Sequence, residues 1–232
     1  MNRDQRKNKA PEPRFQTLNS RFVFTIRFDS AVFPLEIHSL ARALPDLGFL
    51  LVDPLLEIPV GPRVDVRGAI ARKGNTSIDV NSESTSIAVR SIDLQSLTDA
   101  VEKIEHLISQ SFHIDTLSLI QYFEFLAVMT VSTGKNPVAS FMRLAEQLPV
   151  IRAMSAEFGM SVIPFGLRFA SSKDVPTEGP WFEFRAEPLV QLSTSHYWIE
   201  TVYRDHDRKP VQEFMNSYFE HIGNALMIIE QE

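Results

Sequence analysis

The chain of 232 residues contains no cysteine. This absence excludes a disulfide scaffold, a thiol nucleophile and every cysteine-ligated zinc or iron–sulfur site. Long apolar runs are also absent, since no stretch approaches the ~20 residues that span a bilayer. The polar N-terminus is not followed by the hydrophobic region that a secretory signal needs. We therefore expect a soluble, cytoplasmic protein without a membrane span.

Recognised catalytic patterns are missing as well. The six histidines form no HExxH or HxH pattern, and the nine glycines are too scattered for a phosphate-binding loop. The serines lack the Gly-x-Ser-x-Gly nucleophile elbow. Asp205-His206-Asp207 contains acid and base groups, but it lies between a predicted strand and a predicted helix, where aspartate serves turns and caps. We expect no catalytic residue, no metal site and no cofactor.

Acidic residues outnumber basic residues outside the N-terminus. The net charge is −6, while the first 20 residues carry five basic and two acidic groups. Residues 1–19 have almost no apolar content, which predicts a disordered basic arm. An acidic body repels the phosphate backbone of nucleic acids, so nucleic acid is a disfavoured partner. Binding of nucleic acid through the basic arm stays open as an alternative.

Residues 20–112 read as a first α+β unit. Phe22, Phe24, Ile26 and Phe28 alternate with Arg21, Val23, Thr25 and Arg27, which predicts a half-buried strand over 21–28. A short helix after Pro34 and strands over 49–52, 63–72, 76–80 and 85–90 follow. Apolar residues at helical spacing then predict a helix over 94–112, with Ser91 or Asp93 as its N-cap.

Residues 113–232 repeat this order as a second unit. A strand is predicted over 122–131, and a helical region begins at Pro137 and is interrupted by Pro149. Strands are predicted over 162–170, 181–191 and 197–204, and a helix over 211–229. The segments 46–49 and 157–160 both read acid, apolar, glycine, apolar. We therefore predict an internal duplication, with the two units packed as one pseudo-symmetric body.

Two units of strand, helix, strands and long helix resemble the saddle of the TATA-binding-protein-like folds. The resemblance covers residues 21–230 and implies an antiparallel sheet with helices on one face. The polar sheet positions mix basic residues with Glu124, Glu183, Glu187 and Glu200. This composition departs from the basic concave face that minor-groove binding requires.

The candidate binding residues lie in the predicted strands. Strand parity allows four arginines to share the sheet face away from the helices, where each either pairs with a glutamate on a neighbouring strand or binds an anion. Aromatic residues with polar groups are enriched in interfaces, and several cluster in the last two strands. The candidates are Arg27, Arg67, Arg168, Arg185, Trp198 and Tyr203.

The expected function is a non-enzymatic binding or assembly module. It would act through the open sheet face or the seam between the units, with a protein partner or a second copy in a homodimer. The alternative is an enzyme or small-molecule binder with a pocket of Arg and Glu between the units, which would take a small anionic ligand.

Overall fold

The structure is a computed structural model that describes residues 15–29, 37–52, 57–60, 63–111, 119–171 and 180–230. These residues form six α-helices and an open antiparallel sheet, so the predicted α+β class is confirmed. Residues 1–14 of the predicted arm and the predicted helix start at Pro34 lie outside the described residues. Strand β1 begins at Gln16, five residues before the predicted strand, and it takes in the end of that arm.

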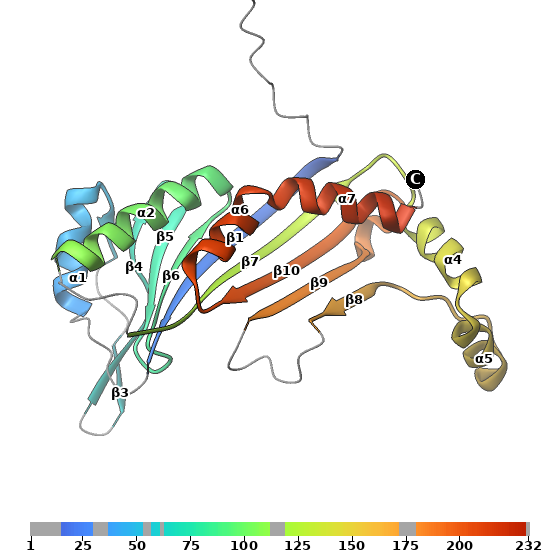
Figure 1. The fold of residues 1–232 in the computed structure, drawn as a ribbon, viewed down its shortest axis with the longest axis horizontal. Helices are drawn as coiled ribbons and strands as arrows, with labels where there is room; N and C mark the ends of the chain where they lie inside the picture. Colours follow the sequence, from blue (N-terminus) through green and yellow to red (C-terminus); the bar gives the residue numbers. More distant parts are fainter. Residues whose placement is uncertain are drawn as a thin grey trace, which may run out of the picture.

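The sheet places the first strands of the two predicted units side by side at its middle. Its order is β2-β4-β5-β6-β1-β7-β10-β9-β8, and β3 pairs with β4 off this path. All these pairings are antiparallel, and the sheet runs without a break through both halves of the chain (Figure 1). The strands are β1 (Gln16–Phe28), β2 (Leu50–Leu51), β3 (Glu57–Val60), β4 (Arg63–Lys73), β5 (Thr76–Asn81), β6 (Ser86–Ser91), β7 (Ile120–Ser132), β8 (Leu167–Ala170), β9 (Trp181–Pro188) and β10 (Tyr197–Asp205).

One face of the sheet carries the core. Phe24 of β1 lies opposite Phe125 of β7 and Val89 of β6, and all three side chains are buried. Alternate residues of each strand point the same way because successive side chains of a strand leave opposite faces. We call this the helix face, since α2, α6 and α7 cover it, and we call the opposite one the open face (Figure 1).

The helices are α1 (Ile37–Ala43), α2 (Leu94–Ser111), α4 (Pro137–Gln147), α5 (Pro149–Phe158), α6 (Arg208–Asn216) and α7 (Tyr218–Glu230). Helix α2 begins where the sequence predicts, because Asp93 Oδ2 accepts a hydrogen bond from the Ser96 amide at 2.7 Å. That bond also lowers the pKa of Asp93. Asn136 caps α4 in the same way, through the Ala139 amide at 3.2 Å.

The last helical stretch differs from its prediction. The sequence predicts one helix over 211–229, whereas the structure breaks it at Ser217, whose φ of −101° and ψ of 7° lie outside the helical region. Helix α6 therefore packs on β7 and β10, and α7 continues in a new direction with Tyr218, Ile222 and Leu226 buried. A straight helix follows a curved sheet less closely than two shorter segments.

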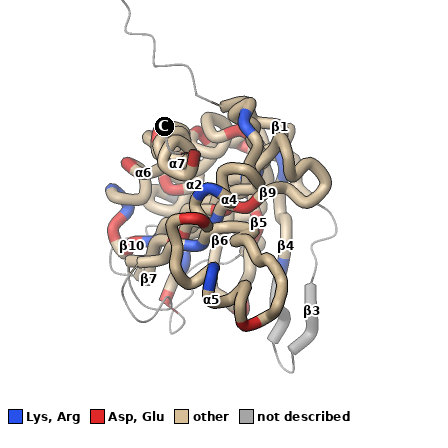
Figure 2. The backbone as a smooth tube through the Cα atoms, turned by 90° about the vertical axis from the view of Figure 1, so that its right-hand side faces the viewer, with Lys and Arg blue, Asp and Glu red and all other residues tan. Residues whose placement is uncertain are grey.

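The two ends of the sheet are covered differently. At the β4 end, α1 and the following turn bury Leu40, Ala41 and Leu44 in the core. At the β8 end, α4 packs against α7, and α5 extends beyond the sheet with none of its residues buried (Figure 1). Viewed from that end, the basic and acidic positions of the described residues are interspersed along the backbone (Figure 2).

Strand β8 is shorter than predicted. The sequence predicts a strand over 162–170, but only Leu167–Ala170 pairs with β9. Pro164 has no amide hydrogen to donate. Gly166 approaches β9 so closely that a Cβ there would lie 2.9 Å from Glu187 Cβ. The segment before Leu167 therefore crosses the end of the sheet outside the ladder, and β8 remains a short edge strand.

Candidate functional site

Five of the six predicted binding residues lie on the open face. The register places Arg27 beside Ser86, Arg67 beside Asn81, and Arg168 beside Arg185, which lies beside Glu200. Trp198 is on the same face of β10. The five do not form one cluster, because β4 and β8 lie near opposite ends of the sheet and β1 lies at its middle.

The arginines of the second half are held in ion pairs. Arg168 donates to both carboxylate oxygens of Glu183 on the adjacent strand, at 2.7 and 3.0 Å. Arg185 bonds Glu187 two residues along its own strand and lies over the Trp198 ring at 5.0 Å. Arg168 thus pairs with a glutamate on a neighbouring strand, whereas Arg185 pairs within its own strand.

The arginines of the first half have different surroundings. Arg67 forms an ion pair with Glu83, a residue outside the predicted set of partners. The Nε of Arg27 is buried and has no hydrogen-bond partner within the described part of the chain. A buried donor without a partner costs about 1–3 kcal/mol. The Nε of Arg67 is buried as well, so burial of this atom does not distinguish the two arginines.

Tyr203 does not lie with the other five. It is paired with Phe125 and Phe182, which face the helices, so its side chain belongs to the helix face. Its ring stacks on Phe214 of α6, with centroids 4.5 Å apart and planes 12° apart. Phe214 in turn stacks on His221 at 5.2 Å. Tyr203 and Trp198 are five residues apart on one strand, and an odd separation places them on opposite faces.

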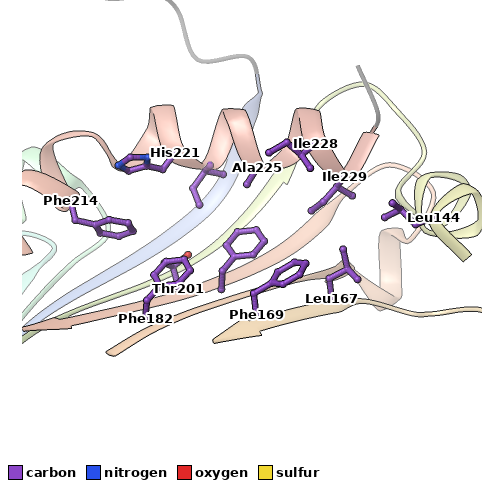
Figure 3. A pocket seen from close by; sticks show the side chains of 12 residues that line it. Leu144, Leu167, Phe169, Phe182, Thr201, Phe214, His221, Ala225, Ile228 and Ile229 are labelled. Atoms are coloured by element: carbon purple, nitrogen blue, oxygen red, sulfur yellow. The ribbon is translucent and has the colours of Figure 1, made fainter. Parts of the chain in front are cut away.

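The structure shows a groove on the helix face that the sequence analysis does not predict. It lies between α7 and the strands β8, β9 and β10, and its volume is about 440 Å³ (Figure 3). We call it the α7 groove. Its lining is Leu144, Leu167, Phe169, Phe182, Phe184, Thr201, Phe214, His221, Ile222, Ala225, Ile228 and Ile229.

The α7 groove is apolar along both walls. Phe169 and Leu167 project from the edge strand toward the groove, and Ile228 and Ile229 face them from α7 (Figure 3). Phe169 is 53% exposed and Ile228 is 75% exposed, so this surface is in contact with water. Exposed apolar patches that are contiguous and concave mark interaction sites more often than chance allows.

Only two lining residues carry polar groups. The Thr201 hydroxyl lies 3.4 Å from the Tyr218 hydroxyl, and both side chains are buried. Burial raises the pKa of Tyr218 well above its ordinary value. The His221 imidazole lies at the α6 end of the groove, stacked on Phe214. This lining is suited to holding apolar surface.

The remaining acid–base candidates have structural roles. His206 Nδ1 lies 2.7 Å from the Gln121 carbonyl oxygen, and Asp205 accepts a hydrogen bond from the Asp207 amide at 3.0 Å. These bonds form the turn that leads into α6. Across the described residues, no group of three or more His, Asp or Glu side chains is placed to hold a metal ion. None of the helices in those residues is long and apolar enough to cross a membrane.

The groove arises from the placement of α4 and α5. Only Leu144 of α4 reaches it, while α5 lies beyond the end of the sheet (Figure 1). The alternation of Leu167 with Phe169 and of Phe182 with Phe184 does indicate an apolar sheet face. No pattern in the sequence shows that this face lacks a covering helix.

The chain matches no protein-family model, and no relative was found among curated proteins.

Proposed function

We propose that the chain is a non-enzymatic binding module that holds an apolar, helix-shaped protein segment in the α7 groove. The observation that carries this proposal is the exposed apolar lining of a groove of about 440 Å³. Amphipathic helices bind such grooves through side chains spaced three and four residues apart. A helix laid between α7 and β8 would cover Phe169 and Ile228 together.

The shape of the groove favours a protein segment over a small ligand. Binding pockets for small molecules enclose most of their ligand and place a few polar groups to orient it. The α7 groove is open on one side, and Thr201 and His221 are its only polar lining residues. Phe165, two residues before β8, is also an exposed apolar side chain. A partner that also covers Phe165 has to be larger than the groove.

We also infer that the fold is an internal duplication with the strand order of the TATA-binding-protein-like resemblance. The sheet supports this inference because β1 pairs with β7 at the centre, β6 and β10 flank them, and β5 and β9 follow. The helices α2 and α6–α7 then correspond, as do α1 and α4. In this correspondence, the α7 groove occupies the position in the second half of the sheet that α1 covers in the first half.

The groove is tested with the dye 8-anilinonaphthalene-1-sulfonate, whose emission rises in apolar surroundings. Phe169→Ser and Ile228→Ser are compared with the native chain and with Leu50→Ser. Leu50 is 77% exposed, close to the 75% of Ile228, but it lies on β2, at the far end of the sheet. Copies of the chain that associate could cover the groove and exclude the dye. The emission is therefore measured over a dilution series of the protein, in which such copies separate. We expect both groove variants to lose at least half of the emission at the lowest concentration, and the control to keep it.

Equal emission from the groove variants and the native chain at every concentration would remove this proposal. Circular dichroism of each variant shows whether it is folded. Both groove substitutions replace exposed side chains, so loss of the fold is not expected.

A second candidate function is the binding of a small anion on the open face. The buried Nε of Arg27, which has no partner in the described residues, favours it. An arginine fork binds phosphate or carboxylate oxygens in pairs. Calorimetry with pyrophosphate tests this candidate on the native chain and on Arg27→Gln, with Arg168→Gln as the control on an arginine already paired with Glu183. Heat that is the same in all three proteins would count against a site at Arg27.

A further inference from the structure

We propose that the segment in the α7 groove is helix α5 of a second copy of this chain, and that two copies exchange α5 helices around a two-fold axis. This inference rests on the proposed function of the groove and names its occupant. It brings together the two exposed apolar surfaces at the β8 end of the molecule: the groove on one copy and the stripe of α5 on the other.

Helix α5 has the amphipathic form that such a groove binds. Val150, Met154 and Phe158 recur every four residues and therefore lie along one side of the helix. These three side chains are 42–59% exposed. Arg152 lies on the opposite side of the helix, where it donates to the Glu146 carbonyl oxygen. The apolar stripe is thus turned toward solvent in a single copy, and a partner surface would bury it.

The connections of α5 place it outside its own groove. Leu148 alone separates α4 from α5, and its extended backbone, with φ of −104° and ψ of 106°, turns the chain there. At the other end Gly159 adopts a left-handed conformation with φ of 61°. The Ser155 hydroxyl then accepts a hydrogen bond from the Val162 amide at 3.1 Å, which ties the returning segment to α5. The helix is held as an arm beyond the sheet (Figures 1 and 2).

The area that exchange would bury is adequate for a stable dimer. Phe158 on the arm, Phe165 in the segment between the arm and β8, and Phe169 on the groove wall are each 47–58% exposed. A buried aromatic side chain contributes about 150–250 Å². Covering these three removes roughly 240–400 Å² per copy and twice that in a symmetric pair. Val150, Met154, Met160 and Ile228 bring the total toward the ~1,600 Å² of a standard interface.

Symmetry favours a closed pair. An arm that enters a neighbour's groove makes a head-to-tail contact, which forms open chains unless the neighbour returns its own arm. Reciprocal exchange closes the assembly at two copies. It also covers both grooves and both arms, so neither of these surfaces is left to bind further copies.

The absence of native cysteine allows a direct test by cross-linking. Met154→Cys places one thiol on the arm, and Ile228→Cys places one on the wall of the groove. The two variants, one of them ¹⁵N-labelled, are mixed, unfolded, refolded together and treated with a short bismaleimide. We expect a covalent pair of one labelled and one unlabelled chain, at least tenfold above the yield from Met154→Cys mixed with Leu50→Cys. Yields equal to that control would overturn the proposal.

Two further measurements separate the other occupants. The double variant Met154→Cys/Ile228→Cys, treated at high dilution, reports whether an arm enters its own groove. Exchange is overturned if the double variant forms a cross-link within one chain while the mixture of the two single variants forms none between chains. Light scattering of the native chain should give twice 26.4 kDa, and Met154→Lys should weaken association at least tenfold. A native monomer at all concentrations also overturns exchange.

The dye experiment keeps the two proposals apart. Dye emission that depends on Phe169 and Ile228, combined with no cross-link between chains, leaves the groove as a binding site for another protein and removes only the second copy as its occupant. Emission that is independent of both residues removes the binding function of the groove itself.

Discussion

Arg208 at the start of α6 donates hydrogen bonds to both carboxylate oxygens of Glu105 on α2. This pair joins the two helices that cover the two halves of the sheet. The Arg208 guanidinium also lies 4.8 Å from the ring centroid of Phe24, on the central strand β1. Burial raises the pKa of Glu105, although the charge of Arg208 acts in the opposite direction. The desolvation of the carboxylate therefore outweighs the ion pair.

The raised pKa of Glu105 predicts a pH dependence of stability. A carboxyl group with a higher pKa in the folded state favours folding most at low pH, and this contribution is lost as the pH rises through the folded pKa. The free energy of unfolding of the native chain, minus that of Glu105→Gln, should therefore be larger near pH 4 than near pH 7. Urea unfolding followed by tryptophan fluorescence measures both. A difference that grows with pH would show that the ion pair with Arg208 dominates.

Two buried tyrosines predict a loss of stability in alkali. Burial raises the pKa of both Tyr197 and Tyr218 well above 10. The unfolded chain releases these protons from about pH 10 while the folded chain retains them, so each residue lowers stability by about 1.4 kcal/mol per pH unit above that point. Tyr197→Phe and Tyr218→Phe should each reduce the steepness of this loss between pH 9 and 11. Tyr122→Phe, at a partly exposed position, serves as control.

The carboxylate of Glu230 predicts a large effect from a residue near the end of α7. It is 5% exposed and accepts hydrogen bonds from Thr133 Oγ1 at 2.5 Å and from the Tyr197 hydroxyl at 3.1 Å. Glu230→Ala leaves both donors without an acceptor and should cost about 2–3 kcal/mol of unfolding free energy. Glu230→Gln keeps one acceptor oxygen and should cost less than half as much. Equal costs would show that charge, not hydrogen bonding, holds the end of α7.

Two ion pairs on the open face predict unequal coupling. The side chains of Arg204 and Glu124 are 15% and 19% exposed, whereas that of Arg168 is 69% exposed. Water and salt screen an exposed pair, so its coupling is weak. A double-mutant cycle on Arg204→Gln and Glu124→Gln should give a coupling of about 1–3 kcal/mol, as is typical of hydrogen bonds to charged groups. The same cycle on Arg168 and Glu183 should give a smaller value that disappears in high salt.

The sequence predicts local structure well where the side-chain pattern is strict. Phe22, Phe24, Ile26 and Phe28 are buried on the helix face, as their alternation indicates. The glycines of the two similar segments, Gly48 and Gly159, both end a helical turn in the left-handed conformation, with φ of 81° and 61°. In these cases the cause lies within a few residues, either in the period of a strand or in the freedom of glycine to adopt positive φ.

The candidate site was less predictable because it depends on contacts distant in sequence. The alternation of side chains along a strand predicts that the arginines lie on the open face. The same alternation predicts that Trp198 and Tyr203 lie on opposite faces. The α7 groove depends instead on the direction that the chain takes after Leu148. Pro149 indicates that a helix is interrupted, but the position of the next helix is determined by tertiary packing. The apolar stripe of α5 is visible in the sequence only as an ordinary core pattern.

The pairing of β1 with β7 has a consequence for the synthesis of the protein. Strand β1 takes its two neighbours from β6 and β7, and β7 begins about a hundred residues after β1 begins. A chain emerging from the ribosome therefore exposes one edge of β1, and the phenylalanines that face Phe123 and Phe125, until β7 has been made. Contacts of such long range slow folding and favour aggregation of partial chains. We expect the first half to depend on the second, so that the nascent chain becomes protease-resistant only late in translation.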